Sequence, residues 1–100
     1  MAYLGGGSAY STYVSTTLVG ASVAAGGAEL THATEPWAKP NQGGIVLPSP
    51  NQAAANAVYP VSWRCTTAGT VLVLWANPTA GALTPANASG ANPYTFIALS

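Results

Sequence analysis

Proline and glycine interrupt this chain at short intervals, and this spacing constrains the fold more than any other feature. The 100 residues include eleven glycines and eight prolines. Proline breaks helices and glycine weakens them, so only short elements fit between the interruptions. The one segment that tolerates a helix, residues 51–57, is enclosed by Pro50 and Pro60. A chain of this length makes one domain, and we expect an all-β domain with minimal helix.

The segments between the interruptions are rich in β-branched and aromatic residues, which favour strands. The expected strands cover residues 11–19, 22–25, 29–33, 45–47, 58–66, 70–75 and 94–99. Gly26 and Gly27 predict a hairpin between the second and third of these segments. Many short strands with frequent turns are typical of a small antiparallel β-sandwich or a jelly-roll-like domain. We expect this domain to span residues 10–100, after a flexible, extended Gly-rich arm at residues 1–9.

Alternation along residues 58–66 predicts that Val61, Trp63 and Cys65 share one face of a half-buried strand. Cys65 is then a buried structural thiol, and no partner cysteine exists for a disulfide. Trp63, Trp75 and Phe96 are expected to pack in the core.

Residues 70–75 are apolar on both faces, because Leu72 and Leu74 alternate with two valines and a tryptophan. Such a strand either lies centrally and is covered twice, or turns its second face toward another subunit.

The chain carries very few charges. Only Glu29, Glu35, Lys39 and Arg64 are charged, or 4% of the residues, against about 25% in a typical domain. Near-zero net charge promotes association, so we expect neighbouring molecules to cover much of the surface. Two basic residues are too few for the clustered Lys and Arg that bind nucleic acid as a main role.

Because ionisable residues are so few, the chain lacks the usual combinations of catalytic residues. The chain has no Asp and a single His, and strand alternation places Glu29 and His32 on opposite faces. His, Cys and Glu occur at no spacing that is typical of a metal site, and the glycine runs lack the features of a phosphate loop. We expect no enzyme activity, no cofactor and no metal.

No segment predicts export or membrane insertion. The first residues lack the basic region of a secretory signal, and the longest strongly apolar run, Val71 to Ala76, is far shorter than the ~20 residues of a membrane span. We expect synthesis in the cytoplasm and no membrane partner.

Tyr and Trp are favoured at interfaces because they combine area with a hydrogen-bonding group. Residues 35–40 predict a rigid exposed loop, and Trp37 within it is the main anchor candidate. A sugar-binding platform is the alternative use of these aromatic residues. The candidate interface residues are Tyr3, Leu4, Tyr10, Tyr13, Trp37, Leu72 and Leu74.

The stretch from Trp63 to Leu99 contains an Ala68-Gly69-Thr70 turn and an apolar strand. A loop with Asn77 to Ala80 and Ala82 to Pro85 then leads to Tyr94-Thr95-Phe96. This order resembles the C-terminal part of virion structural proteins of tailed bacteriophages. The resemblance covers about 40 residues, and Gln42-Gly43-Gly44 stands where such proteins often have a Gly-Asp turn.

The resemblance implies a capsid decoration or cement protein that binds the major capsid protein lattice. Such proteins are often trimers, so a homo-oligomer located in the virion is expected. The alternative is a fibre, knob or neck component that binds host glycans.

Overall fold

The computed structural model describes residues 10–48 and 58–99, and the described part contains six strands and no helix. The strands are β1 (Tyr10–Ser15), β2 (Ala28–His32), β3 (Gly43–Leu47), β4 (Tyr59–Thr67), β5 (Thr70–Ala76) and β6 (Tyr94–Leu99). All pairings are antiparallel, and the strands form one sheet in the order β1-β6-β3-β4-β5-β2. The prediction of an antiparallel all-β domain is therefore confirmed.

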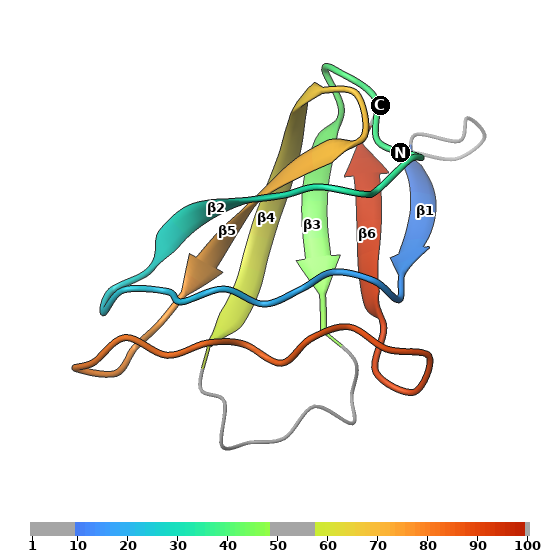
Figure 1. Ribbon diagram of the computed structural model, residues 1–100. Helices are drawn as coiled ribbons and strands as arrows, with labels where there is room; N and C mark the ends of the chain where they lie inside the picture. Colours follow the sequence, from blue (N-terminus) through green and yellow to red (C-terminus); the bar gives the residue numbers. More distant parts are fainter. Residues whose placement is uncertain (1–9, 49–57, 100) are drawn as a thin grey trace, which may run out of the picture.

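One face of the sheet, called here the inner face, carries the core. Three long connections cross this face: residues 16–27, 33–42 and 77–93 (Figure 1). Leu18, Val23 and Ala38 from the first two connections are buried with the inward side chains of the strands. The inward side chains are Val46, Trp63, Cys65, Val71, Val73, Trp75, Tyr94, Phe96 and Ala98. The core thus lies between one sheet and irregular chain rather than between two described sheets.

The connections are held together by hydrogen bonds to buried groups. Val23 and Leu83 exchange two backbone hydrogen bonds, of 2.8 and 3.1 Å. The buried amide of Asn77 donates from Nδ2 to the carbonyls of Val23 and Gly81, both at 2.9 Å. Tyr94 donates its hydroxyl proton to the Ala86 carbonyl at 2.6 Å. These bonds satisfy backbone groups that would otherwise be buried without partners.

The predicted hairpin around Gly26 and Gly27 is wrong. Both glycines have positive φ, 87° and 110°, and form a turn, but the strand that follows pairs with β5. From the segment 22–25, Val23 alone makes a bridge, and its partner is Leu83 in another connection. The pairing with Leu83 replaces the hairpin because it lets the Val23 side chain pack in the core, where it is fully buried.

A register shift in β4 overturns the predicted position of Val61. Pro60 lies opposite Trp75 and Ser62 lies opposite Leu74, so two steps along β4 match one step along β5. The extra residue changes the alternation, as in a β-bulge. Trp63 and Cys65 are buried as predicted, whereas Val61 is 47% exposed on the other side.

Candidate functional site

The side of the sheet opposite the core, called here the outer face, is the candidate functional site. It carries large apolar side chains that the described residues leave about half exposed. They are Tyr10, Val14, Ile45, Leu47, Tyr59, Val61, Leu74 and Leu99, with exposures between 42% and 62%. The largest apolar patch on a typical monomer is about 300–600 Å². Eight large apolar side chains on one face of one sheet differ from single, scattered exposed residues, which need no explanation.

The strand register aligns these side chains in rows across the sheet. One row contains Thr12, Ile97, Ile45, Ser62, Leu74 and Glu29, which are successive cross-strand partners. Three of the six are large and aliphatic, and the polar ones are mostly at the ends. Directly opposite residues are close neighbours in an antiparallel sheet, so Ile97 and Ile45 are in contact range, and Ser62 lies between Ile45 and Leu74.

The sequence produces this surface because β3, β5 and β6 are apolar on both faces. In β3, Ile45 and Leu47 alternate with the buried Val46. In β6, Ile97 and Leu99 alternate with buried aromatic and small residues. A half-exposed antiparallel strand normally alternates between apolar and polar residues. Among the described residues, this second apolar set is not part of the core.

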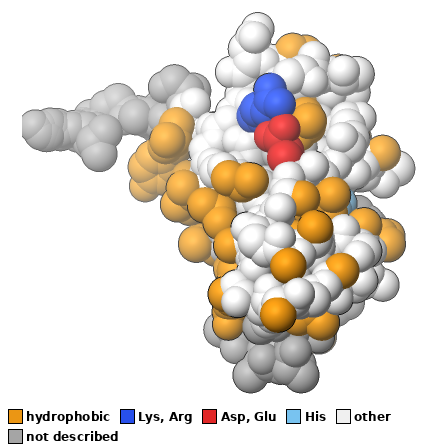
Figure 2. All heavy atoms as spheres, turned by 90° about the vertical axis from the view of Figure 1, so that its left-hand side faces the viewer, with side chains coloured by type: hydrophobic (Ala, Val, Ile, Leu, Met, Phe, Trp, Pro, Cys, Tyr) orange, Lys and Arg blue, Asp and Glu red, His pale blue; other side chains and the backbone are white. Residues whose placement is uncertain are grey.

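One ion pair stands on the outer face. The Arg64 guanidinium donates from Nε to Glu29 Oε2 at 2.8 Å and from Nη2 to Oε1 at 2.7 Å. The hydrogen bond from Arg64, with its charge, lowers the pKa of the Glu29 carboxyl. Figure 2 shows one touching acidic and basic pair on a surface of hydrophobic and uncharged side chains. The two charges neutralise each other, so the face has no net charge among the described residues.

Three predicted interface residues lie on this face. Tyr10 is 56% exposed at the edge of the sheet, Leu74 is 42% exposed, and Leu72 is half-buried. Leu72 lies opposite Arg64 of β4 and Thr31 of β2. Of the two options for β5, a strand covered on both faces is not observed among the described residues, where Leu74 is exposed and Leu72 is half-buried. Tyr3 and Leu4 lie outside the described residues.

Tyr13 and Trp37 point to the inner side instead. Their rings stack with centroids 4.6 Å apart, and Trp37 also packs against the rings of Trp63 and Phe96. The expectation of an exposed loop at residues 35–40 is wrong for Glu35 and Ala38, which are 2% and 1% exposed. The loop folds inward because packing of the Trp37 indole against neighbouring aromatic rings stabilises the fold more than exposure of the indole to solvent would.

Sequence reasoning missed most of the outer face. Val14, Ile45, Leu47, Tyr59, Val61 and Leu99 were not among the predicted interface residues. Leu72 and Leu74 were identified because their strand has apolar residues on both faces. The same pattern occurs in β3 and β6, and it would have identified Ile45, Leu47 and Leu99, which are half of the missed residues.

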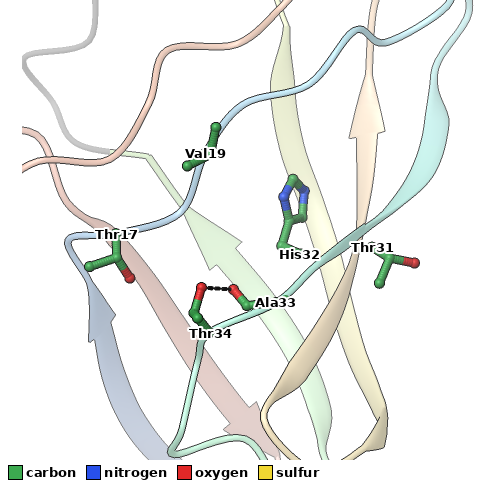
Figure 3. A pocket seen from close by; sticks show the side chains of 6 residues that line it. All are labelled: Thr17, Val19, Thr31, His32, Ala33 and Thr34. Carbon is green, nitrogen blue, oxygen red and sulfur yellow. Dashed lines mark hydrogen bonds between the residues drawn. The ribbon is translucent and has the colours of Figure 1, made fainter.

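A hollow of about 200 Å³ lies elsewhere, on the side of the β1–β2 connection. It is lined by Thr17, Val19, Thr31, His32, Ala33 and Thr34. Figure 3 shows the side chains of His32 and Thr31 pointing in different directions from β2. Thr34 donates its hydroxyl proton to the Ala33 carbonyl. His32 is the one ionisable residue among those that line the hollow.

The His32 ring is already engaged. Trp75 donates from Nε1 to His32 Nε2 at 3.1 Å, and the side chain is only 5% exposed. Burial lowers the pKa of His32, against the smaller opposite effect of a hydrogen bond with the Val19 backbone. The neutral ring is therefore a structural group that connects β2 to the core.

Glu35 is a second buried ionisable group. Its Oε2 accepts a hydrogen bond from Ser15 Oγ at 2.9 Å, and its Oε1 accepts one from Trp37 Nε1 at 3.2 Å. Burial raises the pKa of the carboxyl, although both hydrogen bonds oppose this effect. Through these hydrogen bonds Glu35 joins the end of β1 to the β2–β3 connection. Its side chain is buried and is not part of the outer face.

Two further observations concern ligands and membranes. Within residues 10–48 and 58–99, no three potential metal-ligating side chains of His, Cys, Asp or Glu come together. The described residues also include no helix with the length and apolar character of a membrane span.

Comparisons with protein families, with curated proteins and with solved structures found no match to this chain.

Proposed function

We propose that this protein is a structural component of a bacteriophage particle, which decorates the capsid and stabilises it by packing its outer face against the coat lattice. The observation that carries the proposal is the row of apolar side chains on the outer face, centred on Ile45 and Leu74. The resemblance of residues 63–99 to virion proteins supports the choice of partner.

The size of the outer face fits such a role. A stable protein interface buries about 800 Å² on each partner and has an apolar centre, and the outer face carries eight large apolar side chains with exposures between 42% and 62%. If the chain binds the assembled coat but not the separated coat subunits, its binding shifts the equilibrium toward the assembled coat and so stabilises it. The partner surface is expected to be apolar and uncharged, because the one ion pair of the outer face is internally neutralised.

The β-sandwich expected from the sequence would be completed by the binding partner. In a β-sandwich, two sheets pack face to face about 10 Å apart. The described residues provide one sheet, and a sheet of the coat protein that packs on the outer face would provide the second. The flexible arm predicted for residues 1–9 remains a prediction, as a further contact to a neighbour.

The glycan-binding alternative receives less support. It requires an exposed aromatic platform with Trp37 at its centre. One face of the Trp37 indole is covered by Tyr13 at a centroid distance of 4.6 Å and an interplanar angle of 7°.

A binding experiment with capsids tests the proposal. Particles that lack this protein are incubated with the purified chain and then heated while genome release is recorded. The wild-type chain is expected to bind and to raise the release temperature. Ile45→Lys places a charge in the apolar row and is expected to abolish both effects.

Thr84→Lys is the matched control, since Thr84 is exposed in the β5–β6 connection, on the core side of the sheet. This variant is expected to bind like the wild type. Failure of the wild-type chain to bind, or equal binding by Ile45→Lys, would contradict the proposal. Binding that changes little between low and high salt would agree with a charge-poor contact.

A further inference from the structure

The strand β1 forms one edge of the sheet, and the described residues leave this edge uncovered. Its partner β6 occupies one side only. Tyr10, Ser11, Thr12 and Val14 are all exposed. An edge strand with unpaired backbone groups can accept another strand by hydrogen bonding.

Proteins usually protect such edges with charged residues, proline or a bulge. The sequence of β1, YSTYVS, has neither a charged residue nor a proline. Its pairing with β6 runs from Tyr10↔Leu99 to Ser15↔Tyr94 without a register shift. The strand therefore has none of the three protections and is rich in residues that favour strands.

The opposite edge differs in this respect. β2 carries Glu29, whose carboxylate is fixed by Arg64. It also starts directly after Gly27, whose φ of 110° turns the chain. A charge and a turn make β2 a poorer acceptor for another strand. The asymmetry between the two edges selects β1.

We propose that β1 pairs antiparallel with β1 of a second copy of this chain, so that two six-stranded sheets join into one across a two-fold axis. This proposal does not rest on the capsid function, because it concerns the chain alone. A two-fold interface is closed and self-complementary, so the expected oligomer is a dimer.

The side chains suggest the register. Directly opposite residues in an antiparallel pair point to the same face. With the axis at Thr12, Tyr10 of each copy lies opposite Val14 of the other, and the two Thr12 side chains face each other. Aromatic with β-branched pairs and Thr with Thr pairs are favourable cross-strand neighbours.

The dimer would also extend the outer face. Tyr10, Thr12 and Val14 have their cross-strand neighbours Leu99, Ile97 and Thr95 on that face. Pairing at the edge leaves the rest of the outer face free, so the two copies would present one surface of twice the area.

Disulfide trapping in the full-length chain tests the register. In Thr12→Cys, the two introduced Cα atoms lie about 4.5–5.5 Å apart across the axis, within the range of about 4.4–6.8 Å that a disulfide requires. Mild oxidation is expected to convert most of this variant into a covalent dimer. The native Cys65 is 2% exposed and is not expected to react.

Val14→Cys is the matched control on the same strand and face. Its two thiol-bearing residues would be four positions apart along the paired strands, or about 13 Å, which is too far for a disulfide. The double variant Tyr10→Cys/Val14→Cys restores opposite positions and is expected to form the covalent dimer again.

Sedimentation provides the second measurement, independent of oxidation. The wild-type chain is expected at twice the mass of the chain. Thr12→Lys places two like charges opposite each other at the axis and is expected to sediment as a monomer. Thr31→Lys makes the same change at an exposed position of β2, the other edge, and is expected to stay dimeric.

A monomeric or trimeric wild-type chain would overturn the proposal. So would equal disulfide trapping in Thr12→Cys and Val14→Cys, or dissociation by Thr31→Lys to the same extent as by Thr12→Lys. None of these results depends on whether the chain binds capsids, so the two proposals fail separately.

Discussion

Ile45 of β3 lies directly opposite Ile97 of β6 on the outer face of the sheet, while the neighbouring residue Val46 lies opposite Phe96 in the core. Adjacent residues of one strand thus belong to two apolar surfaces, and residues 10–48 and 58–99 cover only one of them. This relationship separates the residues that stabilise the fold from those available for contact with a partner.

The first prediction follows from that separation. Val46→Thr buries a hydroxyl group at a position that is 3% exposed, and it is expected to lower the free energy of unfolding by about 2 kcal/mol. Ile45→Thr changes a side chain that is 45% exposed and is expected to cost less than about 1 kcal/mol. Urea denaturation of both variants measures the difference. Equal losses would show that the outer face is buried within the monomer.

A second prediction concerns the amide that holds two connections together. Asn77→Ala removes three hydrogen bonds: Nδ2 donates to the carbonyls of Val23 and Gly81 at 2.9 Å, and Oδ1 accepts from Thr79 N at 3.0 Å. We expect a loss of about 3 kcal/mol in the free energy of unfolding.

Asn87→Ala is the control for this amide, because Asn87 Oδ1 accepts one exposed hydrogen bond, from Gly20 N at 2.8 Å. This variant is expected to lose about 1 kcal/mol or less. Thermal denaturation of the two variants tests the order, and a larger loss for Asn87→Ala would be evidence against the role given to Asn77.

Gly44 supplies the third prediction. A Cβ atom at this position would lie 1.9 Å from the carbonyl oxygen of Ile97, so the neighbouring strand would have to move. Gly44→Ala is expected to cost roughly 3 kcal/mol because it forces β3 and β6 apart. Gly81→Ala meets nothing within 4 Å and is expected to change stability by less than about 0.5 kcal/mol. Comparable unfolding midpoints for the two variants would contradict this close approach.

A fourth prediction concerns pH. Burial lowers the pKa of His32 in the folded state below its ordinary value of 6.5. The unfolded chain then binds the proton more tightly, so the contribution of His32 to stability is complete above pH 6.5 and is lost as the pH falls below it. Protonation of Nε2 also removes the acceptor for the Trp75 indole.

Glu35 acts in the opposite direction, because its raised pKa favours the protonated folded form. Its contribution is complete below pH 4.5 and is lost as the pH rises through the raised value. The two effects overlap between pH 4.5 and 6.5, so the wild-type profile alone does not separate them.

A comparison with His32→Gln isolates the histidine. The stability of the wild type relative to this variant is expected to fall between pH 7.5 and pH 5.5, measured by urea denaturation at each pH. A difference that is constant over this range would mean that His32 has the same pKa in the folded and the unfolded chain.

The local patterns of the sequence predicted the C-terminal strands well. The predicted ends of β5 and β6 agree with the structure to within one residue, because each is a short run of β-branched, aromatic and other apolar residues next to turn residues such as Gly69, Pro78 and Pro93. Burial of Trp63, Trp75, Phe96 and Cys65 followed from the same alternation.

The failures share one physical cause, which is non-local contact. The partner of β2 is β5, and their paired residues lie between His32↔Val71 and Ala28↔Trp75, far apart in the sequence, so no local pattern at Gly26 or Gly27 indicates that pairing. Trp37 is half-buried because Tyr13, Trp63 and Phe96 form an aromatic cluster around it. Val61 faces outward because of a bulge that the alternation does not reveal.

Footprinting of the outer face in the free chain and in the phage particle shows whether this face is covered after assembly. Covalent labelling of exposed side chains, read by mass spectrometry, is compared at Ile45, Leu74 and Leu99, with Val19 as a reference that is 65% exposed on the β1–β2 connection. Strong labelling of all four residues is expected in the free chain, and protection of the three outer-face residues but not of Val19 is expected in the particle. Equal labelling of Ile45 and Leu74 in both states would show that the outer face does not contact the coat.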